Sequence, residues 1–331
     1  MKYSRMLISP ILLILFNLQA FGADIGIANR EIIVKGNIGS ADGEFGYKVF
    51  KDRSWVEPSA IAIDSKGNIY IADPLNYRIQ KFNVEGKYVT KITFEAQDET
   101  FAFTINDLVI DNEDNLYILS KRGQKILKYD SKGRIIQSIN LADYMLPERL
   151  DVDVLGNMYV FGTVLVKVPG RGNANRGDCL RKLDKNGRLI KEWNNASLPF
   201  INQEGYVYIR QDAAWKKYDE HEKYLGDVKC EAERQKVSFE KICYFPPVFV
   251  DGKKASYYFV YSDKTEKPRT LLKLSLKGEL RTLDLSSIEI WPWPRVRVEN
   301  MIKFDRNGNL YGYGYDEQKK LYWITRINIA D

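Results

Sequence analysis

The chain has 331 residues, of which 50 are Lys or Arg, 44 are Asp or Glu and one is His, so its formal net charge is +6. A single histidine, His221, disfavours a Ser-His-Asp triad and a histidine-based zinc site. The positive charge is small and mixed along the chain, so it supports an anionic partner only weakly. About 300 residues is ample for one large domain.

The first 22 residues predict a secretory signal peptide. Lys2 and Arg5 precede the apolar stretch Met6–Leu18, and Ala20-Phe21-Gly22 ends in a small residue suited to cleavage. A transmembrane anchor is the alternative, but the apolar stretch is short and contains Ser9-Pro10. We therefore expect 23–331 to be exported to the periplasm or secreted, with no membrane span after cleavage. Export in turn makes a nucleic-acid partner a poor expectation.

The stretch Glu57–Val89 reads as a β-sheet unit. Its apolar runs Ala60–Ile63 and Ile69–Ala72 flank the turn Asp-Ser-Lys-Gly-Asn, in which Asp64 can accept backbone N–H bonds and Gly67 can take a positive φ. Both faces of these strands are apolar, so both should be covered. Such a unit cannot bury itself and needs neighbours of its own kind.

Copies of this unit follow along the chain. The clear ones are Ile105–Leu141, Pro147–Trp193 and Asn300–Ile329, and weaker ones lie between the third and the last. A tyrosine marks each unit at intervals of roughly 40–55 residues, the period of propeller blades. These tyrosines are Tyr70, Tyr117, Tyr159, Tyr208, Tyr258 and Tyr311. Six units predict an all-β fold, a six-bladed β-propeller of four-stranded antiparallel blades.

Several segments of the first unit resemble the NHL-repeat consensus: Pro58–Asp64, Gly67–Tyr70, Ala72-Asp73, Asn76–Phe82 and Gly86-Lys87. The segment Gly39–Phe45 resembles the linker that precedes such repeats. The resemblance implies the propeller fold, but it implies little about activity, because one fold carries many functions. In that family the positions of Asp73 and Arg78 commonly pair and brace the link between the second and third strands, so we expect a structural pair here.

The two ends of 23–331 are expected to share one blade. The last unit supplies three strands, Met301–Asp305, Asn309–Tyr315 and Leu321–Ile329, while Ile32–Lys35 is a strand that precedes the first unit. We expect this N-terminal strand to complete the sixth blade as its outer edge and so close the ring. The outer strands of the other blades are predicted at Tyr88–Phe94, Arg134–Leu141, Arg188–Trp193, Tyr224–Val228 and Glu279–Leu285.

Aromatic and basic residues gather in the links that join an outer strand to the next inner strand and a second strand to a third. Both kinds of link project at one end of a propeller, and the longest are the loops Val164–Asp178 and Ser262–Thr270. This end is the predicted binding surface for a protein or a small anionic or carbohydrate-like ligand. Its candidate residues are Arg53, Trp55, Arg171, Arg176, Trp291, Trp293, Arg295 and Arg297. The alternative is that the aromatic residues only cap the channel and pack between blades.

We expect a monomeric, non-catalytic binding module without a cofactor. The alternative function is a metal-dependent hydrolase or lyase, similar to lactonase-type propellers, that uses carboxylates near the central channel; a divalent cation such as calcium is then possible, with ligands unknown. Amidating lyases on NHL-like propellers need several histidines, which this chain lacks. Asp111–Asn115 has the oxygen-rich composition of a calcium loop. It aligns with the turns that begin at Asp64 and Asp305, however, so turn chemistry explains it.

The three cysteines are Cys179, Cys230 and Cys243. In an oxidising compartment a pair is expected to form a disulfide, and Cys230 with Cys243 is the candidate because both lie in one link. Cys179 would then be a buried thiol at the start of a third strand. Three buried thiols are the alternative. His221 lies in a charged turn between a third and a fourth strand, where we expect it to be solvated and opposite the candidate surface.

Overall fold

The computed structural model describes residues 27–51, 55–94, 104–141, 146–168, 172–194, 196, 200–201, 205–211, 214–228, 249–250, 256–262, 265–274, 280–284, 302–316 and 318–329. Almost all of the regular structure in these ranges is β-strand, and the one short 3₁₀ turn described is η1 (Pro74–Asn76). No helix within these ranges is long and apolar enough to cross a membrane. The predicted signal peptide lies outside the described residues.

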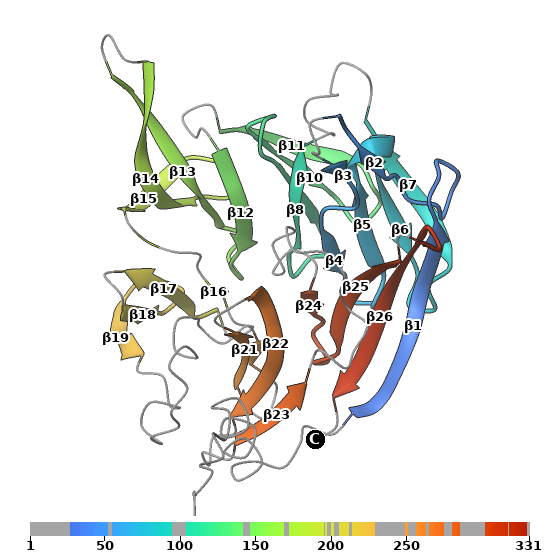
Figure 1. Ribbon diagram of the computed structural model, residues 1–331. Coiled ribbons are helices and arrows are strands. Elements are labelled where there is room, and N and C mark those ends of the chain that lie inside the picture. The colour runs from blue at the N-terminus through green and yellow to red at the C-terminus, as the bar shows by residue number, and fades with distance from the viewer. Residues whose placement is uncertain are drawn as a thin grey trace, which may run out of the picture.

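The described strands form six four-stranded antiparallel sheets (Figure 1), so the fold is a six-bladed β-propeller. The first blade contains β4 (Ile61–Ile63), β5 (Ile69–Asp73), β6 (Arg78–Phe82) and β7 (Tyr88–Thr93). The second contains β8 (Ile105–Ile110), β9 (Leu116–Ser120), β10 (Lys125–Tyr129) and β11 (Ile135–Asn140), and the third contains β12 (Leu146–Val152), β13 (Met158–Val168), β14 (Gly172–Leu183) and β15 (Leu189–Asn194).

The fourth blade contains β16 (Phe200–Ile201), β17 (Val207–Gln211), β18 (Ala214–Tyr218) and β19 (Tyr224–Val228), and the fifth contains β20 (Phe249–Val250), β21 (Ser256–Ser262), β22 (Thr265–Leu274) and β23 (Leu280–Asp284). The last blade has the order β1-β26-β25-β24, with β24 (Ile302–Phe304), β25 (Leu310–Asp316), β26 (Leu321–Ile329) and β1 (Ile27–Asn37). A two-stranded hairpin of β2 (Lys48–Val49) and β3 (Trp55–Val56) precedes the first blade.

The N-terminal strand is the outer strand of the last blade, as the sequence predicted. β1 pairs antiparallel with β26 from Ile27–Ile329 to Asn37–Leu321, so it is longer than the predicted Ile32–Lys35. The added residues 27–31 lie beyond a bulge between Ile32 and Val34, which breaks the simple alternation of apolar residues and hid them from the sequence pattern. The predicted outer strands of the other five blades are confirmed, with their ends within one residue.

The hydrophobic core lies between successive blades. Ile61, Ile69 and Ile71 of the first blade pack with Tyr311 and Ile324 of the last. Further clusters of the same kind join the first blade to the second, the second to the third and the third to the fourth. The second strands supply most of this surface because they are apolar on both faces, with every residue of β5 and of β9 buried.

A repeated device stabilises the first turn of the blades. Asp111 Oδ1 accepts the backbone N–H groups of Glu113 and Asn115 at 2.9 Å, and its Oδ2 accepts the Asn115 side-chain amide at 2.9 Å. Lys128 on the third strand lies 3.3 Å from the same Oδ2 and 4.7 Å from the Tyr117 ring centroid. The turns at Asp64, Asp153 and Asp305 make the same Asp and Asn bonds. Turn chemistry therefore accounts for Asp111–Asn115, as the sequence predicted.

The register explains the recurring tyrosine and corrects one of its positions. Tyr70, Tyr117, Tyr159 and Tyr208 stand opposite Lys81, Lys128, Lys182 and Lys217, and Tyr311 stands opposite Arg326. In the fifth blade the residue opposite a lysine is Tyr257, which pairs with Lys273, so the prediction of Tyr258 was wrong by one residue. Adjacent tyrosines allowed this error, because a one-residue slip moves a side chain to the other face of the sheet.

Candidate functional site

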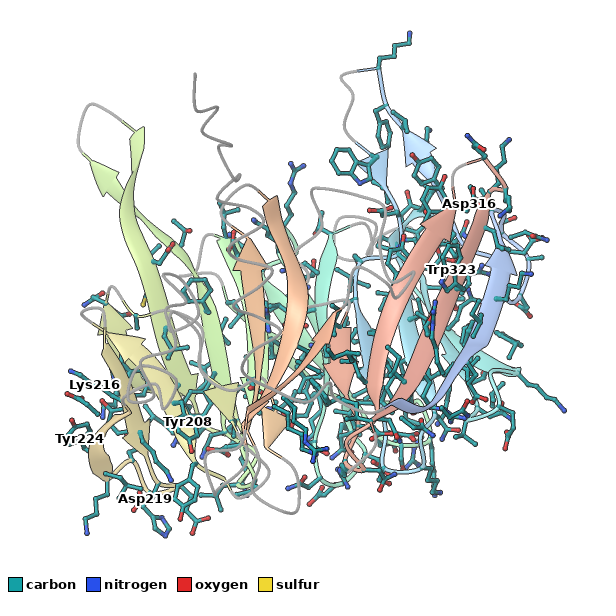
Figure 2. All side chains as sticks on the ribbon, turned by 60° about the horizontal axis from the view of Figure 1, so that its bottom comes forward. Tyr208, Lys216, Asp219, Tyr224, Asp316 and Trp323 are labelled. Atoms are coloured by element: carbon teal, nitrogen blue, oxygen red, sulfur yellow. The ribbon has the colours of Figure 1, made fainter. Side chains whose placement is uncertain are left out.

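The blades have two unlike ends. Asp316 is the last residue of the second strand of the last blade, Asp219 follows the third strand of the fourth, and Figure 2 shows them at opposite ends of the molecule. We call the end that carries Asp316 the upper end and the end that carries Asp219 the lower end. The β2–β3 hairpin and the β13–β14 hairpin both project at the upper end (Figure 2), where the sequence predicted the binding surface.

The long links of the third and fifth blades are strands rather than loops, which corrects the sequence prediction. In the third blade the pairing of β13 with β14 continues through Val164–Gly177, Leu165–Asn175, Val166–Ala174, Lys167–Asn173 and Val168–Gly172. In the fifth blade Tyr261 pairs with Pro268 and Ser262 with Thr265. The β-branched residues of Val164–Val168 favour an extended backbone, which explains why the insertion lengthens the sheet.

Of the predicted binding residues, Trp55 is the one whose side chain the structure describes. It lies in β3 and is half-buried, and its indole Nε1 donates to Glu57 Oε1 at 3.1 Å. Arg176 belongs to β14, but its side chain is outside the described part. The other predicted binding residues, Arg53, Arg171, Trp291, Trp293, Arg295 and Arg297, and the disulfide candidates Cys230 and Cys243 lie outside the described residues. Cys179 is buried in β14, as expected.

Glu57 is a buried carboxylate that the sequence reasoning missed. Only 6% of its surface is exposed, and Tyr313 OH donates to its Oε2 at 3.3 Å. Burial raises the pKa of Glu57, and the hydrogen bonds from Trp55 and Tyr313 offset part of that rise. The hydrogen bond from Tyr313, which belongs to β25, connects the segment just before the first blade to the last blade.

A stack of tyrosines extends from this carboxylate. Tyr313 and Tyr315 each stack on Tyr322, with ring centroids 5.4 and 4.5 Å apart, and Tyr47 lies 5.1 Å from Tyr315. Burial raises the pKa of Tyr313 and Tyr322 well above the ordinary value of a phenol. The alternation Tyr-Gly-Tyr-Gly-Tyr over 311–315, which places all three tyrosines on one face of β25, was the sequence signal for this stack.

The inner strands bring a second group of charged residues together at the centre of the propeller. Asp107 on β8 is fully buried, and its Oδ2 lies 3.3 Å from Arg149 Nε on β12. Its Oδ1 lies 3.5 Å from Lys303 Nζ on β24. These strands belong to the second, third and last blades and face a common centre (Figure 1), so Lys303 reaches past the first blade. We call Asp107, Arg149, Asp151 and Lys303 the axial cluster.

The two carboxylates of the axial cluster differ in their surroundings. Asp107 accepts the backbone N–H groups of Leu108 and Leu150, both at 3.0 Å, in addition to its cations. Asp151 accepts the N–H of the adjacent Val152 at 2.9 Å. Burial raises the pKa of Asp151 to about 6, although Lys303 and Arg149 act in the opposite direction. Asp151 can therefore exchange a proton near neutral pH.

The axial cluster does not suit a divalent cation. Such ions take several oxygen ligands, whereas Arg149 and Lys303 hold the carboxylate of Asp107. Within the described ranges, no three His, Cys, Asp or Glu side chains lie close enough together to hold a metal ion. His221 is solvated as predicted, with 77% of its side chain exposed next to Asp219 at the lower end (Figure 2).

Comparisons with known proteins agree with the fold. Residues 52–196 match the family DUF5128, which is described as a 6-bladed β-propeller. The chain matches none of the curated proteins with which it was compared. A solved structure described as a proposed gluconolactonase has a TM-score of 0.50 at 13% identity, covering 92% of this chain and 95% of its own.

Two further solved structures are similar at a slightly lower level. Virginiamycin B lyase from Staphylococcus aureus has a TM-score of 0.49 at 12% identity, covering 82% of this chain and 95% of its own. A gluconolactonase from Xanthomonas campestris has a TM-score of 0.49 at 12% identity, covering 93% of this chain and 98% of its own. At such identities the likeness concerns the fold alone.

Proposed function

We propose that this protein is an exported NHL-type propeller that binds a partner protein at its upper end, with 23–331 as the mature domain. An extended segment of the partner adds to the edge of the β13–β14 hairpin. Trp55 and the basic residues Arg171 and Arg176 then contribute contacts on the same end. The function is recognition rather than catalysis.

The observation that carries this proposal is the length of the β13–β14 hairpin. Gly162–Cys179 is the pair that corresponds to Asp73–Arg78, the last pair of β5 with β6, and the hairpin continues for six pairs beyond it. The described pairing of β12 with β13 ends at Leu146–Thr163, and that of β15 with β14 ends at Cys179–Asn194. Among the described strands, the edge of β13 beyond Thr163 has no neighbouring strand, and its N–H and C=O groups can accept an added strand.

The composition of the hairpin also favours a protein partner. Val164, Leu165, Val166 and Val168 give one strand high β-propensity and an apolar character, while Lys167 interrupts the apolar run. A strand of this kind pairs readily with an extended segment whose side chains alternate. The basic residues near the tip favour a partner segment that carries acidic groups.

Site-specific photo-crosslinking tests this proposal. A benzophenone side chain introduced at Val166, on the hairpin edge, should give one dominant crosslinked species in cells. The same group at Lys132, an exposed turn residue of the lower end, serves as the matched control and should give no such species. A variant in which 165–175 is replaced by a two-residue turn should lose the partner. Equal crosslinking at both positions, or partner recovery unaffected by the trimming, would contradict it.

A hydrolase or lyase that uses the axial carboxylates is the second candidate. Asp151 favours it, because a pKa near 6 suits a group that gives or takes a proton at neutral pH. A screen of esters and lactones with the wild-type protein and with Asp151→Asn tests this candidate. Turnover by the wild type that the variant loses would favour it over the binding module.

A further inference from the structure

Lys303 is held loosely at the centre of the propeller. Its ammonium group has three N–H donors, yet the partner found for it in the described part of the chain is Asp107 Oδ1 at 3.5 Å. Charge-assisted hydrogen bonds are normally about 2.7–2.9 Å long, so this contact is an ion pair rather than a strong hydrogen bond. The side chain is 22% exposed, so the described residues do not enclose it completely.

Asp107 has about one acceptor site left, on Oδ1, for the three N–H donors of this ammonium. Its two oxygens already accept the N–H groups of Leu108 and Leu150, and Arg149 Nε lies 3.3 Å from Oδ2. Asp107 is also fully buried in β8, so it cannot move toward Lys303 without breaking these contacts. Two cations therefore converge on one carboxylate that is already engaged by the backbone.

We propose that Lys303 and Arg149 form a binding site on the propeller axis for a small anion, an oxyanion or the carboxylate group of a larger ligand. The anion takes the N–H donors of Lys303 that Asp107 does not satisfy and lies beside the Arg149 side chain. With Asp151 protonated, the charges of Lys303, Arg149 and the Asp107 carboxylate leave one net positive charge at the axis, and its attraction for a negative ion is stronger among low-dielectric sheets than in water.

Asp151 makes the affinity of this site depend on pH. The charged and titratable groups that face it are Arg149 on its own strand, Asp107 on β8, Lys303 on β24 and Tyr159, its pairing partner on β13. Tyr117 on β9 faces Asp111 instead, and β16 consists of Phe200 and Ile201, which do not titrate. Ionised Asp151 competes with the anion for the cations. Its protonation as the pH falls below about 6 removes that competition and strengthens anion binding.

Calorimetric titration with sodium sulfate at constant ionic strength tests the site, because sulfate keeps its charge over the whole pH range used. The wild-type protein should bind sulfate saturably, about tenfold more tightly at pH 5.0 than at pH 7.5. Asp151→Asn should bind tightly at both pH values. Lys303→Met should lose saturable binding, and Lys303→Gln provides a second variant that keeps a polar side chain in case the first does not fold.

Lys319→Met is the matched control, since Lys319 is exposed at the upper end and pairs with Asp316 at 3.0 Å. It should bind sulfate as the wild type does. The proposal is overturned if the wild-type protein shows no saturable binding at pH 5.0, or if a folded Lys303 variant binds sulfate like the wild type. The trimming experiment changes residues 165–175 of the β13–β14 hairpin, and none of them belongs to the axial cluster. The proposed partner binding and the axial anion site can therefore be refuted independently of each other.

Discussion

The lower and upper ends of the blades show two different uses of the same repeat. At the lower end the first, second, third and last blades all fold their first turn around an aspartate, with an asparagine four residues later. At the upper end the pair that corresponds to Asp73–Arg78 is Ser120–Lys125 in the second blade and Gly162–Cys179 in the third. The lower end thus stabilises the fold in a uniform way, while the upper end is free to differ and carries the candidate binding surface.

The upper end of the first blade is held by a buried ion pair. Arg78 Nε donates to Asp73 Oδ2 at 2.8 Å, and its two terminal nitrogens donate to the carbonyl groups of Ser40, Ala41 and Glu44 in the linker before the blade. The pairing that the NHL resemblance implied is therefore present. In the third blade Gly162 takes the place of Asp73, and its pairing partner is Cys179. In the third blade the two strands do not end at this pair, and the β13–β14 hairpin continues to Val168–Gly172.

Arg78→Met should have the largest effect, because it leaves Asp73 as a buried charge and frees three carbonyl groups. Asp73 is fully buried and Arg78 is 3% exposed, so we expect a loss of about 3–5 kcal/mol of unfolding free energy. Urea unfolding measures it. Arg134→Met is the control, since Arg134 is largely exposed and its pair with Asp130 should contribute under about 1 kcal/mol. Similar losses in both variants would contradict the distinction between buried and exposed pairs.

Asp111→Ala should come next, with a loss of about 2–3 kcal/mol. Burial alone would raise the pKa of Asp111, but the hydrogen bonds from Asn115 and Glu113 and the charge of Lys128 lower it overall. A lowered pKa means that the ionised carboxylate stabilises the fold at neutral pH, and that this contribution is lost as the pH falls below about 4. Asp111→Asn keeps an acceptor for the turn and should lose less. Equal losses for Ala and Asn would show that the turn does not depend on the acceptor.

Asp151→Asn should act in the opposite direction and stabilise the protein at pH 7 by about 1–3 kcal/mol. Because burial raises the pKa of Asp151 to about 6, the folded state binds a proton that the unfolded state, with a pKa near 4, releases. The unfolding free energy of the wild type should therefore fall as the pH rises from about 4 to 6, and the variant should lack this pH dependence. Thermal melts across this range measure it, and an unchanged slope in the variant would contradict the assignment.

Trimming the β13–β14 hairpin between 165 and 175 should have the smallest effect on stability. The removed pairs extend past the level at which β12 and β15 stop, so the unfolding free energy should change by less than about 1 kcal/mol. The lower turns of the third blade remain intact. A large loss of stability would show that the hairpin supports the blade, and the comparison between the two ends would then need revision.

Local patterns predicted the parts of this fold that local chemistry controls. The spacing of aspartate, glycine and asparagine predicted the lower turns, and Gly67 has the positive φ of 77° that the turn requires. In the second blade Asp114 takes that place with a φ of 61°, and its carboxylate accepts bonds from the N–H and hydroxyl groups of Ser65 in the first blade. The third-blade insertion was predicted as a loop because it is long, although its β-branched residues favour a strand. Short-range patterns do not show how far two strands stay paired.

The sequence by itself determined the propeller, its period and the solvated position of His221, because each follows from residues close together in the chain. The N-terminal strand in the last blade followed from a count of strands, since the last unit supplies three of the four that a blade needs. Only the tertiary structure brought Asp107, Arg149, Asp151 and Lys303 together, since these residues come from three blades and up to about 200 positions apart. The tertiary structure likewise brought the Tyr313 hydroxyl within hydrogen-bonding distance of the Glu57 carboxylate. The physical reason is that burial and long-range pairing, rather than spacing, determine which charges meet and how strongly they interact.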